Sequence, residues 1–130
     1  MATFQKFEEI DAWRKARKLT SEIYQVSGEG RFARDFGLKD QLRRAAVSIM
    51  SNIAEGYDRS GTGEFAQFLA IAKGSAAEVR CQLYVALDQG YIDDQHFLAL
   101  KELSAETGMM IGGLIKYLRR SGYKGTKFRT

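Results

Sequence analysis

The chain has 130 residues, of which 45% are apolar and 28% are charged, and its formal net charge is +4. This length favours one domain with a single core and excludes two domains of ordinary size. The sequence contains no Pro, which favours long uninterrupted helices and excludes a Pro-rich disordered chain.

Targeting signals and disulfides are also not expected. The opening residues, MATFQKFEEIDAW, contain no apolar stretch of signal-peptide length, and no window of about 18 residues is apolar throughout. We therefore expect a cytoplasmic protein that does not contact a membrane. The single Cys81 excludes an intrachain disulfide and a metal site built from several cysteines.

Apolar residues recur every three or four positions in four segments, roughly residues 6–27, 36–57, 62–89 and 93–121, and this pattern predicts a helix in each. The predicted buried stripe of the first segment consists of Trp13, Ala16, Thr20, Ile23 and Val26. The predicted buried stripe of the second consists of Leu38, Leu42, Ala45, Ile49 and Ile53.

The third segment follows the loop DRSGTG, with Thr62 as its predicted N-cap and Gly90 as its predicted stop. Its stripe consists of Phe65, Leu69, Ala72, Ala76, Val79, Leu83 and Ala86. The last segment opens with Asp93 and Asp94, and its stripe consists of Leu100, Leu103, Thr107, Ile111, Leu114 and Leu118. Long helices joined by short connections predict an all-α fold, an antiparallel up-down four-helix bundle, with a basic tail at residues 122–130.

A polar stripe lies beside the apolar stripe of the second segment. Its members fall within about 80° of one another on a helix, and they are Gln41, Arg44, Ser48, Asn52, Glu55 and Arg59. One hypothesis is a structural polar network at a bundle or subunit junction, in which Arg pairs with Glu and the amide bonds to the backbone. The alternative hypothesis is a ligand-binding groove.

The third segment has a second face of small residues opposite its apolar stripe, where a monomeric bundle normally shows charges. This face includes Ala66, Ala70, Gly74, Ala77 and Cys81. A Gly inside a helix costs about 1 kcal/mol relative to Ala. Gly74 therefore shows that helix propensity alone does not explain why this face consists of small residues. The face predicts close packing against another copy of the chain, and the alternative is an ordinary Ala-rich surface helix.

Positive charge gathers after Glu106, where six Lys or Arg residues occur without an acid, whereas residues 1–106 have a net charge of −2. Cations with Tyr117, Tyr123 and Phe128 between them are typical of contacts with phosphates and unpaired bases. The alternative is a solvated helix end whose cations complement the helix dipole. The candidate nucleic-acid-binding residues are Arg14, Lys15, Arg17, Lys18, Lys116, Arg119, Arg120, Lys124, Lys127 and Arg129.

Candidates for catalysis are weak. His96 lies beside Asp93 and Asp94 at a helix start, where capping explains it better than metal binding does. Cys81 has no His nearby in the sequence, which favours a packing role. The sequence contains neither a phosphate-loop motif nor a Glu-x-x-His pair. We therefore expect no enzymatic activity, no metal and no cofactor.

The chain resembles the four-helix-bundle family named for proteins encoded in intervening sequences of bacterial 23S ribosomal RNA genes. The most specific part of the resemblance is QLRRAAVSI, SNIAEG and LAIAKGSAAE, at residues 41–49, 51–56 and 69–78, and the earlier AWRKARKLTSEIY is also similar to the family's first helix. The chain has Ala33 and Met50 where the family usually has Pro. A Pro at position 50 would kink the second helix, so Met50 is expected to straighten it.

This resemblance implies a homopentameric barrel of four-helix bundles. It also implies kinship with accessory proteins of diversity-generating retroelements, which bind nucleic acid and a reverse transcriptase through basic surfaces. It implies no catalytic role for the matching positions, which are Gln41, Arg43, Arg44, Ser48, Asn52, Glu55, Gly56 and Arg59. The expected function is a non-catalytic homo-oligomeric scaffold that binds RNA or DNA and serves as an adaptor for a nucleic-acid enzyme. The alternative is a bundle that binds a protein or a small ligand and has no nucleic-acid role.

Overall fold

The computed structural model describes residues 4–59 and 61–121, which form four α-helices and two short 3-10 helices. The α-helices are α1 (Asp11–Ser27), α2 (Phe36–Asp58), α3 (Thr62–Asp88) and α4 (Asp94–Ser121). The 3-10 helices are η1 (Phe7–Glu9) and η2 (Phe32–Arg34). The described residues contain no β-strand, so the predicted all-α class is confirmed for this part of the chain.

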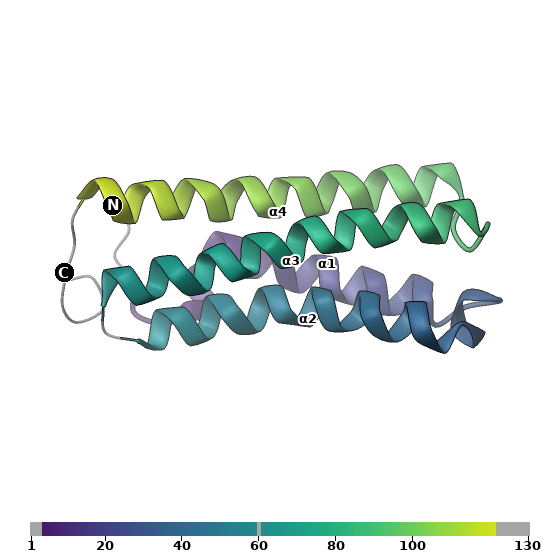
Figure 1. Ribbon diagram of the computed structural model, residues 1–130, viewed down its shortest axis with the longest axis horizontal. Coiled ribbons are helices and arrows are strands. Elements are labelled where there is room, and N and C mark those ends of the chain that lie inside the picture. The colour runs from purple at the N-terminus through teal and green to yellow at the C-terminus, as the bar shows by residue number, and fades with distance from the viewer. Residues whose placement is uncertain (1–3, 60, 122–130) are drawn as a thin grey trace.

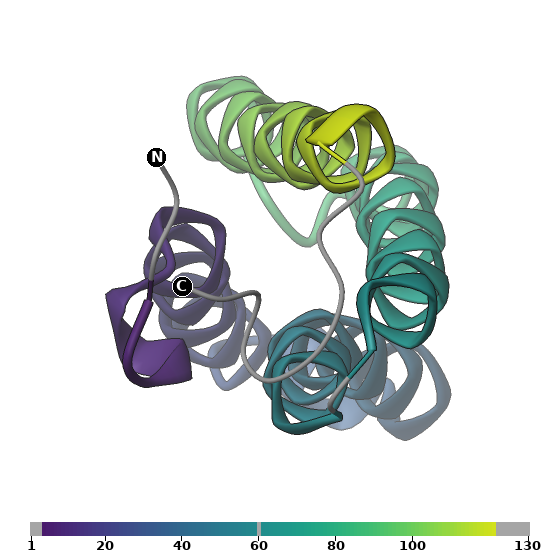
Figure 2. The ribbon, with the colours of Figure 1, turned by 90° about the vertical axis from the view of Figure 1, so that its left-hand side faces the viewer.

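The four helices lie side by side along the long axis of the molecule, and each runs opposite to the one before it (Figure 1). Viewed end on, α1 lies opposite α3 and α2 lies opposite α4 (Figure 2). Each helix packs against its neighbours in the sequence, and α4 also packs against α1. The arrangement is the predicted up-down bundle, and none of its described helices has an apolar stretch long enough to cross a membrane.

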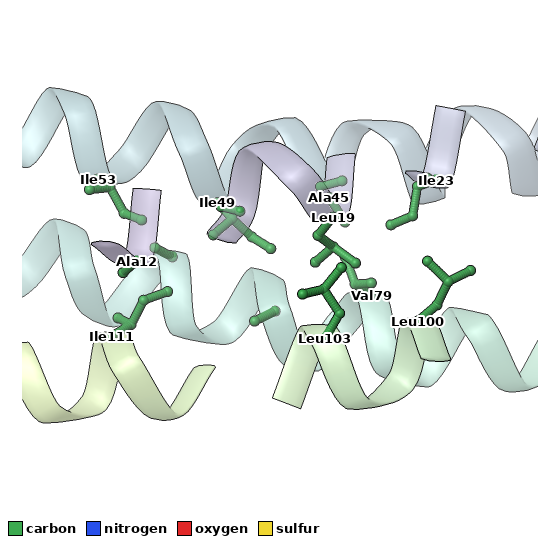
Figure 3. Packing of buried hydrophobic residues seen from close by; sticks show 14 of the residues in the cluster. Ala12, Leu19, Ile23, Ala45, Ile49, Ile53, Val79, Leu100, Leu103 and Ile111 are labelled. Atoms are coloured by element: carbon green, nitrogen blue, oxygen red, sulfur yellow. The ribbon is translucent and has the colours of Figure 1, made fainter. Parts of the chain in front are cut away.

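The core is made by one stripe from each helix, and α2 and α3 bury the residues that their periodicity predicts. All seven predicted positions of α3 are buried, and in α2 only Leu38 of the five is half-buried. In α4, Ile115 is buried, whereas the predicted Leu114 is half-buried. Figure 3 shows side chains from all four helices, among them Leu19, Ile49 and Val79, meeting in this core.

The first helix is shorter than predicted, and its buried stripe is rotated. It begins at Asp11 because Ile10 has an extended backbone, with φ −77° and ψ 121°. Because Ile10 lies outside the helix, the direction of its side chain does not follow the helical period. The side chain is buried in the core, with 2% of its surface exposed. The predicted Trp13, Thr20 and Val26 are half-buried. The buried residues of α1 are Ala12, Ala16, Leu19, Ile23 and Ser27.

Specific residues mark the start of α2 and the two ends of α3. The N-cap Asp35 accepts a hydrogen bond from the Leu38 N–H through Oδ1, at 3.1 Å. Gly90, whose φ is +73°, follows α3 as predicted. The prediction of Thr62 as an N-cap is wrong by one residue, because Gly61 holds that position with an extended backbone and Thr62 is the first residue of α3.

The close packing of α2 against α3 depends on Gly56. A Cβ at this position would lie 2.7 Å from the Cβ of Phe68 and 3.0 Å from Cδ1 of Phe65. Only a residue without a side chain therefore allows the two helices to approach this closely. α2 also continues through Met50 without interruption, and the straightening expected from the absence of Pro there stays a prediction.

Candidate functional site

The uncharged members of the polar stripe lie along the boundary between α2 and α3. Gln82 Nε2 donates to Gln41 Oε1 at 3.2 Å, and the hydroxyls of Ser48 and Ser75 are 3.0 Å apart. Asn52 Nδ2 donates to the backbone oxygen and the hydroxyl of Ser48, at 2.9 and 3.0 Å. The Gln82–Gln41 and Ser48–Ser75 contacts join α3 to α2, whereas the Asn52 bonds stay within α2. The contacts between the two helices suit the hypothesis of a structural junction.

The charged members of the stripe lie at separate places and do not form one network. Arg44 Nε donates to Asp40 Oδ2 at 2.8 Å, one turn earlier in α2. At the other end of α2, Arg59 Nη2 lies 3.0 Å from Glu55 Oε2, and its Nη1 lies 3.8 Å from Glu64 Oε2 of α3. Exposed ion pairs contribute at most about 1 kcal/mol, so these pairs orient side chains more than they stabilise the fold.

The small residues predicted as an oligomer interface are mostly exposed on the outer face of α3. Ala70, Gly74, Ala77 and Cys81 are exposed, whereas Ala66 is 6% exposed and is covered by its own chain. A Cβ added at Gly74 would meet no atom within 4 Å, so packing within the chain does not require Gly there. The cost of a helical Gly, about 1 kcal/mol, is therefore not offset inside the single chain.

The α3–α4 groove runs between these two helices, and small residues form its floor. The floor residues are Ala70, Gly74, Ala77, Ala105, Gly108, Gly112 and Gly113. Four cations line the groove, Lys73 and Arg80 from α3 and Lys116 and Arg119 from α4. No acidic residue lines it, and none of the four cations forms an ion pair with another described residue. The fold thus joins predicted interface residues and predicted nucleic-acid-binding residues in one groove.

Three of the four predicted cations of α1 line one groove, and Lys15 lies apart from them. Lys15 is directed toward α4, where its Nζ lies 3.5 Å from Glu106 Oε1. Arg14 Nη1 lies 3.9 Å from Asp11 Oδ1. The groove of Arg14, Arg17 and Lys18 also contains two acids, so this surface has a mixed charge. The groove is lined by Glu8, Trp13, Arg14, Arg17, Lys18, Ser21 and Glu22.

The predicted cations at the end of α4 are exposed where the structure describes them. Lys116 and Arg119 belong to the α3–α4 groove, and Arg120 lies beside Tyr117 in a neighbouring depression. The three cations of the predicted tail, Lys124, Lys127 and Arg129, lie outside the described residues.

The α1–α2 groove lies between the end of α1 and the first half of α2, and its lining includes Arg44 and Ser48 of the predicted polar stripe, together with Gly37 and Asp40. Its other lining residues were not predicted as a site. Tyr24, Phe36 and Val47 line it with 44%, 71% and 39% of their surfaces exposed, together with Lys39 and Arg43. The four α2 positions are three, four and four residues apart, so periodicity could have identified them as one face. Only the fold brings Tyr24 of α1 beside them.

Three cations and one acid line the α1–α2 groove; Arg44 pairs with Asp40, whereas Lys39 and Arg43 are held by uncharged groups. Arg43 donates from Nε to Ser27 Oγ at 2.8 Å and from Nη2 to the Tyr24 carbonyl oxygen at 3.1 Å, and its Cζ lies 4.2 Å from the Tyr24 ring centroid. Lys39 Nζ donates to the Ala33 carbonyl oxygen at 3.0 Å. Neither Arg43 nor Lys39 forms an ion pair with a residue in the described ranges.

His96 takes part in the cap of α4. Its backbone N–H donates to Asp93 Oδ1 at 2.7 Å, and its ring Nδ1 lies 2.8 Å from the same oxygen. The hydrogen bond from the His96 backbone, and then that from its ring, hold the pKa of Asp93 below its usual range. Among residues 4–59 and 61–121, no group of three His, Cys, Asp or Glu side chains is placed to hold a metal ion.

Comparisons with known proteins show what the chain is similar to. The family model of the 23S rRNA-intervening sequence protein matches residues 8–113, a range that contains most of both grooves. The fold is similar to the crystal structure of a protein of unknown function from the S23 ribosomal protein family of Bacteroides thetaiotaomicron. The TM-score is 0.74 and the identity 22%, over 81% of this chain and 98% of that chain, which shows a shared fold alone. The comparison with curated proteins finds no match.

Proposed function

Because the chain belongs to the family of 23S rRNA-intervening sequence proteins, we propose that it is a non-catalytic homo-oligomeric scaffold that binds RNA or DNA through basic surfaces. The proposed assembly is a pentamer in the cytoplasm, and the proposed partner is a nucleic-acid enzyme for which the scaffold acts as an adaptor. The match to the family carries no activity with it, so support for this function comes from the chemistry of the grooves.

The observation that carries the proposal is the unpaired positive charge of the α3–α4 groove. Lys73, Arg80, Lys116 and Arg119 line one groove without an acid among the lining residues. Such cations are free to neutralise phosphates, and each neutralised phosphate releases condensed counterions from the nucleic acid. The groove therefore offers a run of phosphate-binding positions on a single chain.

The floor of the same groove supports self-association. Alanines and glycines let another helix approach closely, and the open space at Gly74 leaves room for it. Lys and Arg side chains lay their aliphatic stems along such an interface while their charged ends stay in water. Assembly would then repeat the cations at every subunit junction, and several weak sites on one particle bind a polyanion much more tightly than one site does.

A second candidate function is protein binding without nucleic acid. Met109 lines the α3–α4 groove with 75% of its surface exposed, and exposed Met is common on surfaces that bind partner helices. In that case the cations would select an acidic partner protein instead of a phosphate backbone. The two candidates are separated by the response to nucleic acid and to an acidic polypeptide.

The test is fluorescence anisotropy of nuclease-treated, purified protein with labelled single-stranded RNA, duplex RNA and duplex DNA. Titrations at low and physiological salt would be repeated with size-matched polyglutamate as competitor, and the mass of the particle would be measured by sedimentation. We expect binding that weakens steeply with salt and survives polyglutamate. An absence of binding at low salt would overturn the nucleic-acid role and leave protein binding as the function.

A further inference from the structure

We propose that the α1–α2 groove binds an unpaired nucleotide of single-stranded nucleic acid. In this site Phe36 stacks on the base, while Arg43 and Lys39 bind the adjacent phosphate. The inference rests on the proposed function, because it assumes that the scaffold binds nucleic acid. It adds the strand type and a site that lies apart from the cations of α4.

Arg43 is a cation with a fixed position. Its two hydrogen bonds, to Ser27 and to the Tyr24 carbonyl, use two of the five N–H donors of a guanidinium. The bonds and the Tyr24 ring together hold the group at the end of α1. The remaining donors keep the planar arrangement that matches phosphate oxygens, and little side-chain entropy is left to lose on binding.

Lys39 adds a second fixed charge on the same side of α2. Its ammonium group is bonded to the Ala33 carbonyl and lies 5.0 Å from the Phe36 ring centroid. Carbonyls, a hydroxyl and aromatic rings hold a cation without neutralising it. Asp40 also lines the groove but pairs with Arg44. The charges of Lys39 and Arg43 therefore have no paired acid, and they lie beside an exposed ring.

Phe36 has the properties of a stacking ring. It is the first residue of α2, and 71% of its surface is exposed, so the core of the chain does not account for a large apolar residue here. The cap formed by Asp35 and the Leu38 N–H fixes the backbone from which the ring projects. An aromatic ring on a fixed backbone next to fixed cations is the arrangement with which proteins bind single strands.

The same geometry favours single strands over duplexes. A base inside a duplex is already stacked on both faces, whereas an unpaired base offers a free face to an aromatic side chain. Phosphate contacts alone would not distinguish the two. The contribution of Phe36 should therefore be confined to single strands.

The experiment compares the Phe36→Ala and Phe36→Trp variants with wild type by anisotropy, using labelled single-stranded RNA, single-stranded DNA and a duplex. Leu98→Ala is the matched control, since Leu98 is 59% exposed on α4 and does not line the groove. We expect Phe36→Ala to weaken binding of single strands about five- to 150-fold, with less than about a twofold change for the duplex. Phe36→Trp should retain the affinity, and Leu98→Ala should have no effect.

The outcomes separate this inference from the proposed function. If wild type binds single strands and Phe36→Ala binds them equally well, the site is refuted while the scaffold function stands. If Phe36→Ala weakens single strands and the duplex alike, the groove does not read unpaired bases and the inference is also wrong. If wild type binds no nucleic acid at low salt, both proposals fail together. A loss confined to RNA or to DNA supports the site and identifies the preferred strand.

Discussion

The two grooves contain charge of the same sign but hold it in different ways. In the α1–α2 groove, carbonyls, a hydroxyl and aromatic rings fix Arg43 and Lys39 in place. In the α3–α4 groove, four cations without ion pairs surround a floor of alanines and glycines. A fixed cation beside a ring can select a ligand by its shape, whereas cations without ion pairs, beside alanines and glycines, suit any polyanion or another helix. Under the proposed function, the first groove would discriminate between ligands, and the second would provide assembly and general affinity for nucleic acid.

The strongest test of this division introduces charge into the floor of the α3–α4 groove. Glu at both Ala70 and Ala77 should abolish assembly, because the longer side chains would occupy the space that the close approach of another helix requires. Sedimentation should then report the mass of the single chain, 14.6 kDa, with an unchanged helical circular dichroism spectrum. Val85→Glu is the control, at an exposed apolar position of α3 outside the groove. An unchanged particle mass in the double variant would place the interface elsewhere.

A smaller effect is expected from the cations of the same groove. Replacing Lys116 and Arg119 with Gln should weaken binding of single strands and duplexes alike. The plot of log affinity against log salt concentration should also become less steep, by roughly one for each phosphate that the variant no longer binds. Lys101→Gln is the matched control, since Lys101 lies on α4 beside the Tyr84 ring and outside the groove. A weakening restricted to one strand type would contradict the role of general affinity.

The anchoring of Arg43 can be tested by comparison with its neighbour in the sequence. Arg43→Met removes the donor for Ser27 Oγ and the Tyr24 carbonyl, and should lower the free energy of unfolding by about 1–2 kcal/mol. Arg44→Met breaks only the exposed pair with Asp40 and should change it by less than about 0.5 kcal/mol. Urea unfolding of both variants gives the comparison. Equal effects would mean that Arg43 is not held more firmly than Arg44.

The smallest expected effect concerns the N-cap of α2. The Leu38 N–H, and then the Tyr91 hydroxyl, lower the pKa of Asp35. A lowered folded-state pKa means that the charged cap stabilises the fold above the unfolded pKa of about 4, and that this contribution is lost as the pH falls through the folded pKa. Asp35→Asn should therefore be less stable than wild type at neutral pH, and urea unfolding should show the difference shrinking in acid. A constant difference would exclude the carboxylate charge as its source.

The fold could be predicted from the sequence where packing follows one helical period. The stripe of α3 from Phe65 to Ala86 keeps that period for its whole length, and every position is buried. The stripe of α1 could not be placed as well, because the break at Ile10 sets where the helix starts and depends on contacts outside it. The half-buried Trp13 was predicted as core for this reason, while the fully buried Leu19 was missed.

Helical periodicity also predicts the candidate sites only in part. The polar stripe of α2 could be recognised from spacing, but its partners Ser75, Gln82 and Glu64 belong to α3, and only the fold identifies them. The α1–α2 groove as a whole was missed because two helices each contribute part of it. Periodicity describes one helix at a time, so a site between helices becomes visible only when the bundle is assembled.

The break before α1 has a practical consequence. The bend at Ile10 brings η1 back onto α1, where the Phe7 ring lies 5.2 Å from the ring of Trp13 in an edge-to-face contact. Trp13 is the only tryptophan in the chain. Its fluorescence is therefore an intrinsic optical reporter for this corner of the bundle. The wavelength and intensity of its emission should change when η1 lifts from α1, so stopped-flow mixing can time that event without an attached dye.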